Sequence, residues 1–361
     1  MAADADLKGW PVSKKILFVG AGAVGSYIGA FLSRAGHDVT LVDAWADQVE
    51  TIRRQGISVI GPHDPFNARP KAVHLHEAQR LPRDFQIVFV AVKVYDTPWA
   101  AQLALRHASP DGVIVSSQNC WPDPTVAGVT GAQRTVGVIM ARIGVALWKP
   151  GVVERGMEKG QSQGHHVFRV GEHDGRITAR AKELAEMLSI IDGSQVTDNL
   201  WGERWSKLCA NAMGNPVTAM SGLGSVEAAS SVLGRAITIH LAGESARVGL
   251  ALGYRVPKFN GESAERWADS TRRETWEALD AMLTPKATSA RNWRASMAQD
   301  ILKGRPSEID YMNGHVVAQG RSVGVPTPVS LATVAMVKEI EAGTRKPSPE
   351  NIAEVLKLAG V

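Results

Sequence analysis

A glycine-rich turn near the N-terminus constrains the fold more than any other feature of the sequence. The apolar run ILFVG at 16–20 is typical of a buried parallel strand, and residues 20–25 follow the pattern GxGxxG. Residues 24–35 then space their apolar side chains as a helix does. A strand, a glycine turn and a helix in this order predict the first unit of a dinucleotide-binding sheet, and a glycine turn without a ligand is the alternative.

The glycines of this turn have separate expected tasks. Gly20 would make the tight turn, Gly22 would leave room for a pyrophosphate, and Gly25 would let the helix approach the strand. The phosphates would meet unpaired N–H groups at the helix N-terminus. The predicted cofactor-binding residues of the turn are Gly20, Ala21, Gly22, Ala23, Val24 and Gly25.

Asp43 is the residue from which we predict the type of dinucleotide. It ends the expected strand 38–43, where an acidic residue accepts hydrogen bonds from the adenosine ribose. A carboxylate at this place repels a 2′-phosphate, so NAD is the predicted cofactor and NADP is disfavoured. A solvated aspartate that begins the next turn is the alternative interpretation.

The rest of the first half alternates between helix and strand patterns. Residues 46–56 are expected to form a helix that ends at Gly56, and 86–93 and 112–119 are expected to form buried strands. This alternation predicts a doubly wound parallel sheet with helices on both faces.

The second half has a different character. From about Trp201 onward helix patterns dominate, and runs of β-branched residues are scarce. A chain of 361 residues is long enough for two domains. We therefore predict an α/β protein with a Rossmann dinucleotide-binding domain at 1–197 and an all-helical substrate domain at 198–361.

The composition argues against several classes of protein. Charged residues make up 21% with a net charge of +4, and no Lys/Arg run marks a nucleic-acid-binding arm. No apolar run is long enough to span a membrane, and the N-terminus, expected to be loose over 1–13, lacks the core of a signal peptide. The 2 cysteines make no disulfide framework and no zinc motif. We expect a cytoplasmic protein without nucleic-acid, membrane or metal partners.

The segment KLCANAMGNP at 207–216 is the most informative part of the second half. Lys207, Asn211 and Asn215 are spaced at i, i+4 and i+8, so one continuous helix would place them on one face. One cation and two amides could bind a small anionic ligand, and a protonated lysine could donate a proton to a carbonyl oxygen. On spacing alone, a solvated helix face is the better interpretation.

Motifs along nearly the whole chain resemble, in the same order, those of the ketopantoate reductase (2-dehydropantoate 2-reductase) family. They are GAGAVG in the first turn, VAVKVYD around Lys93, QN at 118–119, KLxxNxxxNP, SMAQD at 296–300 and SEIDYMNG at 307–314. The resemblance implies an N-terminal Rossmann domain, a helical C-terminal domain and an active site in the cleft between them.

The resemblance also implies roles for single residues. Lys207 matches the catalytic lysine that protonates the keto oxygen, and Glu308 matches the acidic residue that orients this lysine and the substrate. Lys93 matches a residue that contacts the cofactor, and Asn119 one that lies near both the nicotinamide and the substrate. The remaining substrate-binding positions match Asn211, Asn215 and Ser296. A nearby ammonium suits this chemistry, because hydride delivery to a ketone builds negative charge on its oxygen.

The chain departs from the family pattern at two places. After Asn119 the family usually has glycine, whereas this chain has Cys120 followed by Trp121. Many members carry an arginine suited to a 2′-phosphate near the end of the second strand, where this chain has Asp43. These departures put the substrate in question more than the reaction.

Three functions follow as hypotheses. The first is a nicotinamide-dependent oxidoreductase that transfers hydride between the cofactor and a 2-oxo or 2-hydroxy acid, with Lys207 as general acid/base. The second is a dehydrogenase of the same fold that oxidises a bulkier or aromatic hydroxy compound with NAD, as the Trp121 loop suggests. The third is a non-enzymatic nucleotide sensor, which would need neither Lys207 nor Glu308. A homodimer is the assembly considered for all three.

Overall fold

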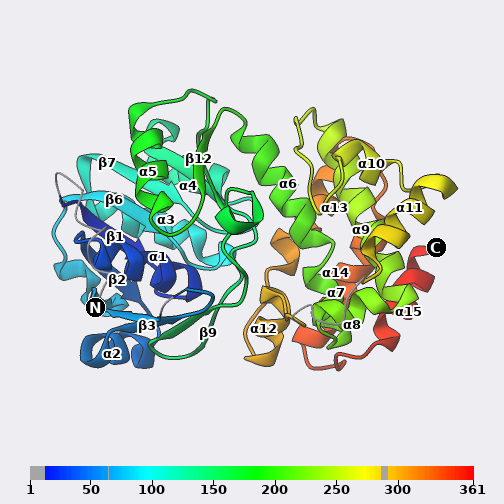
Figure 1. The fold of residues 1–361 in the computed structure, drawn as a ribbon, viewed down its shortest axis with the longest axis horizontal. Coiled ribbons are helices and arrows are strands. Elements are labelled where there is room, and N and C mark those ends of the chain that lie inside the picture. The colour runs from blue at the N-terminus through cyan, green and yellow to red at the C-terminus, as the bar shows by residue number, and fades with distance from the viewer. Residues whose placement is uncertain (1–12, 64, 286–291) are drawn as a thin grey trace. The chain divides into compact units, whose positions relative to one another are not determined.

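The computed structural model describes residues 13–63, 65–285 and 292–361 (Figure 1). The extension expected at 1–13 therefore lies almost wholly outside the described residues. The chain divides into two compact units, residues 1–200 and 201–361, called here the N-terminal unit and the C-terminal unit. In the described part of the chain, no helix combines the length and the apolarity needed to cross a membrane.

The N-terminal unit is built from alternating strands and helices (Figure 1). Its strands are β1 (Lys15–Val19), β2 (Asp38–Asp43), β3 (Ile57–Ile60), β4 (Phe66–Ala68), β5 (Lys71–His74), β6 (Phe85–Val90), β7 (Ala108–Ser116), β8 (Thr135–Met140), β9 (Val145–Lys149), β10 (Val152–Arg155), β11 (Phe168–Glu172) and β12 (Ser194–Thr197). Its helices are α1 (Ala23–Arg34), α2 (Ala46–Gln55), α3 (Thr97–His107), α4 (Asp123–Thr130) and α5 (Ala179–Ser189).

The main sheet has the strand order β12-β11-β8-β7-β6-β1-β2-β5. From β5 to β8 neighbouring strands run parallel, and β11 is antiparallel to β8. Alternate residues of β1 enter different cores: Ile16 packs with α1 and α5 on one face, and Leu17 with α3 and α4 on the other. The predicted doubly wound sheet with helices on both faces is therefore confirmed.

A smaller sheet with the order β4-β3-β10-β9 was not expected from the sequence. It joins two distant stretches of chain, because β3 pairs in parallel with β10 through Ser58 and Val152. Val59 and Val153 are fully buried in the same core as α1. The sheet therefore covers α1 on the side away from the main sheet.

The C-terminal unit is helical, as predicted, with one isolated β-bridge between Phe259 and Glu262 in its described residues. Its helices are α6 (Leu200–Ala212, which begins at the last residue of the N-terminal unit), α7 (Asn215–Ser221), α8 (Ser225–Ser230), α9 (Val232–Ala251), α10 (Ala264–Ala268), α11 (Arg273–Leu283), α12 (Ser296–Leu302), α13 (Asn313–Ser322), α14 (Pro328–Glu341) and α15 (Glu350–Ala359), with the 3₁₀ turn η5 at Ile309–Tyr311.

The long helix α9 organises the packing of this unit. The Trp205 indole of α6 lies fully buried over Gly249 of α9 and donates a hydrogen bond to the Ser245 carbonyl oxygen at 2.9 Å. A Cβ at Gly249 would lie 2.1 Å from the indole nitrogen, so glycine is required for this close approach. The contact fixes the helix that carries Lys207 against the core of its own unit.

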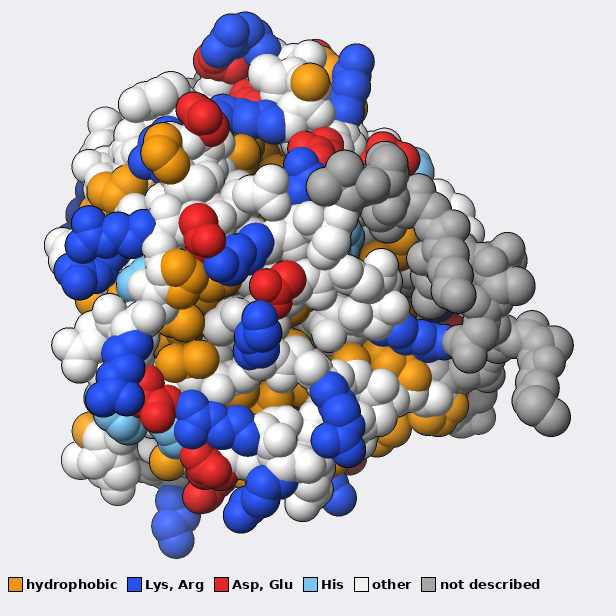
Figure 2. All heavy atoms as spheres, turned by 90° about the vertical axis from the view of Figure 1, so that its left-hand side faces the viewer, with side chains coloured by type: hydrophobic (Ala, Val, Ile, Leu, Met, Phe, Trp, Pro, Cys, Tyr) orange, Lys and Arg blue, Asp and Glu red, His pale blue; other side chains and the backbone are white. Residues whose placement is uncertain are grey.

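On the face drawn in Figure 2, Lys and Arg side chains are interspersed with acidic ones. Ion pairs on the surface of the N-terminal unit include Lys15 with Asp84 at 2.7 Å and Lys71 with Asp38 at 2.8 Å. Pairs of this kind contribute little to stability because water screens both partners.

Candidate active site

The glycine turn has the geometry that its sequence predicts. Gly20 has φ +109°, a left-handed conformation that glycine adopts without strain. A Cβ at Gly25 would lie 2.0 Å from the Gly20 carbonyl oxygen, so only glycine allows this approach of α1. A Cβ at Gly22 would meet no described atom within 4 Å. Open space therefore lies over the N-terminus of α1, where N–H groups can receive an anion.

Asp43 ends β2, as predicted, and its carboxylate is fixed by two backbone groups. Oδ2 accepts a hydrogen bond from the Ala21 N–H at 2.6 Å, and Oδ1 accepts one from the Trp45 N–H at 2.8 Å. The carboxylate thus lies directly beside the glycine turn. A ribose bound at the turn would find this acceptor already oriented.

Arg53 of α2 and His74 of β5 both contact acidic side chains. The Arg53 guanidinium donates to the Ala72 carbonyl oxygen at 2.9 Å and pairs with Glu50 and Glu77. His74, opposite Asp43 in the β2–β5 register, contacts Glu50 at 2.7 Å, and this hydrogen bond holds the pKa of Glu50 below its ordinary value. The guanidinium of Arg53 is thus already bound by two carboxylates and one backbone carbonyl oxygen.

Two loops that carry predicted site residues are fastened to each other. Lys93 follows β6 and Asn119 follows β7, and both strands end earlier than their sequence patterns suggested. The buried Gln118 donates at 2.9 Å to the Val92 carbonyl oxygen and to the Thr97 hydroxyl. The carboxyl ends of adjacent parallel strands meet at one edge of a sheet, so Lys93 and Asn119 lie at the same edge as the glycine turn.

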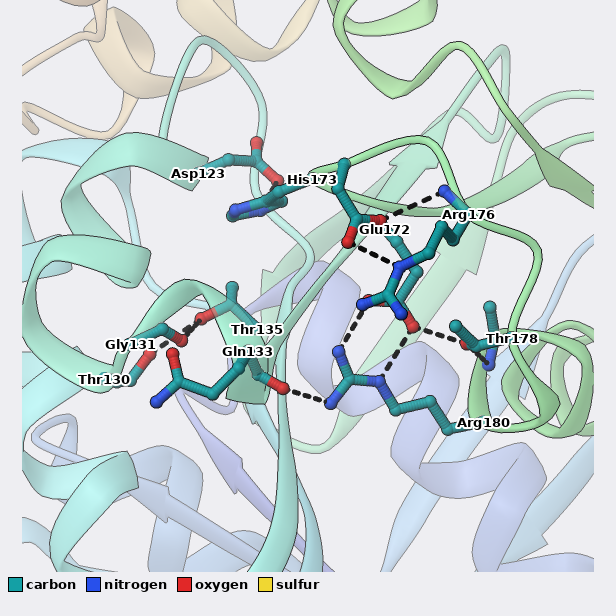
Figure 3. A network of polar contacts seen from close by, with 12 residues as sticks. Asp123, Thr130, Gly131, Gln133, Thr135, Glu172, His173, Arg176, Thr178 and Arg180 are labelled. Carbon is teal, nitrogen blue, oxygen red and sulfur yellow. Dashed lines mark hydrogen bonds and ion pairs between the residues drawn. The ribbon is translucent and has the colours of Figure 1, made fainter.

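The loop after Asn119 is anchored at its far end. Asp123, the first residue of α4, is fully buried, and its Oδ1 lies 3.5 Å from Nε2 of His173 (Figure 3). A Cβ at Gly137 would lie 2.7 Å from the same carboxylate oxygen, so a glycine in β8 makes room for it. Below this pair, Arg180 binds Glu172 with two nitrogens at 2.8 and 2.6 Å.

Cys120, which stands where the family pattern has glycine, has a backbone conformation that favours glycine. It is buried and has φ +65°, in the left-handed region that disfavours a side chain. A non-glycine residue in this conformation strains the backbone of the loop.

We expect Cys120→Gly to be more stable than Cys120→Ala by about 1 kcal/mol, because only glycine relieves a left-handed conformation. Both variants lose the thiol, so their difference isolates the backbone. Urea denaturation of the two proteins measures this difference. An alanine variant as stable as the glycine variant would show that the conformation at 120 is not strained.

The helix expected to be continuous over 207–216 is broken, so this prediction was wrong. Helix α6 ends at Ala212, and α7 begins at Asn215 with Pro216 in its first turn. Proline cannot continue a helix but fits its first turn, and Pro216 therefore favours a new helix start at Asn215 over an unbroken helix. Lys207 and Asn211 share one face of α6, whereas Asn215 starts the next helix.

A hydrogen bond nevertheless keeps the two asparagines together. The Asn215 amide nitrogen donates to the Asn211 carbonyl oxygen at 3.2 Å. Its Oδ1 accepts hydrogen bonds from the Ser296 hydroxyl at 3.0 Å and from the Met297 N–H at 3.3 Å. The structure thus brings together three of the predicted substrate-binding residues, of which Asn211 lies one turn beyond Lys207.

A hydrogen bond connects the segment that contains Glu308 to the end of α6. Glu308 is buried immediately before η5, and Asn313, five residues on, is fully buried. The Asn313 side chain donates to the Ala212 carbonyl oxygen at 3.1 Å, at the end of α6. Asn313 was not singled out from the sequence, although it stands in the SEIDYMNG motif.

Apolar side chains of α6 pack into the core. Trp205 and Leu208 are buried, and so is Met213 just beyond the end of the helix. Cys209 is fully buried among them, and burial raises the pKa of its thiol, so it stays protonated and unreactive. Among the described residues, no group of His, Cys, Asp and Glu side chains is arranged to hold a metal ion.

Comparison with known proteins identifies the family. A family model described as Ketopantoate reductase PanE/ApbA matches residues 16–172, and the model of its C-terminal domain matches residues 199–341. The chain belongs to the ketopantoate reductase family. It is therefore a nicotinamide-dependent oxidoreductase acting on CH–OH groups, and the family suggested by the motifs is confirmed.

Relatives named 2-dehydropantoate 2-reductase align over almost their full length. The Archaeoglobus fulgidus protein is 27% identical over 337 residues, which cover 91% of this chain and 99% of the relative. The Mesorhizobium japonicum protein is 29% identical over 347 residues, which cover 90% of this chain and 97% of the relative.

Solved structures of the family share the fold. The PanE/ApbA family ketopantoate reductase of Ralstonia eutropha JMP134 has a TM-score of 0.74 at 23% identity, over 91% of this chain and 99% of its own. A ternary structure of D-mandelate dehydrogenase with NADH and anilino(oxo)acetate has a TM-score of 0.73 at 21% identity, with the same coverage.

Proposed function

We propose that the protein transfers hydride between a nicotinamide cofactor and a 2-oxo acid or its 2-hydroxy acid. The observation that carries this proposal is the hydrogen-bonded group of Asn211, Asn215 and Ser296, of which Asn211 lies one turn beyond Lys207. A cation beside amide and hydroxyl groups suits a small substrate with both a carboxylate and a reducible oxygen.

The residues of the N-terminal unit fit a nicotinamide dinucleotide. Gly22 leaves space for the pyrophosphate at the N-terminus of α1, and Asp43 offers its carboxylate to the adenosine ribose. Lys93 and Asn119, at the carboxyl ends of β6 and β7, would contact the nicotinamide half. When bound, the nicotinamide supplies the hydride for reduction or accepts it in oxidation.

The C-terminal unit would supply the proton. In reduction, the Lys207 ammonium donates a proton to the substrate oxygen as negative charge develops there. Glu308 would hold this ammonium charged and oriented. Asn215 carries two amide hydrogens, of which the Asn211 carbonyl takes one, so the other can serve the substrate. A cytoplasmic location and a homodimer remain predictions from the sequence.

The experiment that tests this function follows the absorbance of reduced nicotinamide with a panel of 2-oxo acids, and of 2-hydroxy acids in the reverse direction. Turnover that depends on the 2-oxo group supports the proposal. Tight cofactor binding without turnover of any panel member would instead identify a nucleotide sensor.

A bulkier or aromatic substrate is the second candidate. Trp121 follows the strained Cys120 in the loop next to Asn119, and the D-mandelate dehydrogenase structure that shares this fold contains an aromatic oxo acid. The panel therefore includes phenylglyoxylate and mandelate beside ketopantoate. A kcat/KM at least 10-fold higher for the aromatic acids would favour this candidate, since that ratio corresponds to about 1.4 kcal/mol.

We expect NAD(H) to be preferred over NADP(H) by roughly 10- to 100-fold in kcat/KM. Two unit negative charges about 4 Å apart repel by on the order of 4 kcal/mol at a surface-like dielectric, and screening reduces this. Two backbone N–H groups hold Asp43 in place, and Arg53 is engaged with Glu50 and Glu77. Both features leave the 2′-phosphate facing the carboxylate.

The measurement compares both cofactors at one fixed substrate concentration. Equal values, or a preference for the phosphorylated cofactor, would mean that Asp43 does not read the ribose.

A further inference from the structure

The Gln48 side chain joins three separate parts of the N-terminal unit. It comes from α2 and is fully buried. Its amide nitrogen donates to the Ala21 carbonyl oxygen and to the Ser26 hydroxyl, each at 3.0 Å. Its amide oxygen accepts a hydrogen bond from the Gly151 N–H at 2.8 Å. Both amide hydrogens and the carbonyl oxygen of Gln48 are therefore used.

The Ala21 backbone, in the middle of the glycine turn, is held by side chains on both sides. Its N–H donates to Asp43, and its carbonyl oxygen accepts from Gln48 and, at 2.8 Å, from the Ser26 hydroxyl. The next residue is Gly22, over which open space lies. These side chains therefore set the conformation of the backbone that faces this space.

Gly151 connects the turn to the smaller sheet. It lies between β9 and β10 with φ +72°, and a Cβ there would lie 2.5 Å from the Thr51 methyl group of α2. The β9–β10 turn is thus pressed against α2 at the place where Gln48 reaches it. The smaller sheet is therefore connected to the glycine turn through Gly151 and Gln48.

We propose that Gln48 is a positioning residue for the pyrophosphate of the cofactor, which it serves by fixing the Ala21–Gly22 backbone and tying it to the smaller sheet. The inference rests on the proposed dinucleotide function. Without the Gln48 amide, the buried Gly151 N–H loses its hydrogen-bond acceptor, and the Ala21 carbonyl oxygen loses one of its donors. The glycine turn then shifts, and its contacts with the pyrophosphate weaken because they depend on alignment.

The test compares Gln48→Met, which keeps the length of the side chain and removes its hydrogen bonds, with the wild type by calorimetric titration. ADP-ribose contains the pyrophosphate, whereas adenosine lacks it. We expect roughly 10-fold weaker binding of ADP-ribose and an unchanged affinity for adenosine. In turnover, KM for the cofactor should rise by a similar factor while kcat at saturation stays within about 3-fold.

The matched control is Gln86→Met. The Gln86 oxygen accepts a hydrogen bond from the Lys15 N–H at 3.0 Å, at the opposite end of β1 from the glycine turn. This variant makes the same substitution and loses a hydrogen bond to a backbone N–H, but at an exposed position, and its affinity for ADP-ribose should equal that of the wild type.

Two results would overturn the inference: unchanged ADP-ribose affinity in Gln48→Met, or an equal loss for adenosine and ADP-ribose, which indicates general loosening of the fold. Where Gln48→Met does not fold, Ser26→Ala is the second variant, because it removes the other donor to the Ala21 carbonyl oxygen. It should weaken the binding of ADP-ribose and leave the binding of adenosine unchanged. Unchanged binding of ADP-ribose to Ser26→Ala overturns the inference as well. Wild-type protein that binds neither ADP-ribose nor NAD contradicts the proposed function itself, whatever the variants do.

Discussion

Replacing Lys207 with alanine should lower kcat by roughly 10²- to 10⁴-fold, the usual effect of losing a general acid. Lys207 lies on α6, one turn before Asn211, whose carbonyl oxygen binds Asn215. An alanine there leaves this group of side chains in place and removes the cation and its proton. Single-turnover kinetics at saturating cofactor measures the chemical step directly.

The cofactor should bind the Lys207→Ala variant almost as well as the wild type, because the dinucleotide residues belong to the N-terminal unit. Lys258→Ala, which removes an exposed lysine of the C-terminal unit, is the control and should keep full activity. A wild-type kcat in Lys207→Ala would remove this residue from the mechanism.

The sequence was informative wherever neighbouring residues determine the structure. The strand at 38–43 and the helix that ends at Gly56 were predicted with their observed bounds, because apolar runs and glycine stops are local signals. The break at 213–214 could also have been predicted, since Pro216 marks the first turn of a new helix.

Features that depend on distant pairing could not be predicted in this way. The smaller sheet needs Ser58 to pair with Val152, and its strands are too short to show an alternating pattern. In the sequence, Gln48 looks like an ordinary polar residue of an amphipathic helix. Only the structure shows that it is buried and that its amide binds the backbones of Ala21 and Gly151.

The candidate site shows the same division. Periodicity placed Lys207 and Asn211 on one helix face, which they share in the structure, and resemblance to a family gave them their roles. Ser296 and Glu308 were found only through resemblance to a family, because nothing local relates them to α6. The hydrogen bond between Ser296 and Asn215 supplies the missing relation for Ser296, although it spans 81 positions of the chain.

Glu308 and Lys207 should act as one unit, so that the effects of losing them do not multiply. Glu308 is buried, and its segment is fastened to the end of α6 by the Asn313–Ala212 hydrogen bond. Glu308→Ala alone should lower kcat by roughly 10²-fold or more, because the ammonium loses its orientation. With both residues replaced, kcat should fall no more than about 3-fold below that of the poorer single variant, as for residues that cooperate in one step.

A double-mutant cycle on kcat measures this coupling, with thermal unfolding of each variant to establish that it is folded. Glu308→Gln separates charge from shape: it keeps the side-chain length and a hydrogen-bond acceptor, but cannot stabilise an ammonium by its charge. If orientation by a hydrogen bond is the main task, this variant should retain more activity than Glu308→Ala; if the charge matters most, both should be equally poor. Fully multiplicative losses in the double variant would show that the two residues act independently and that their pairing is wrong, because a positioning group has nothing left to position once the lysine is gone.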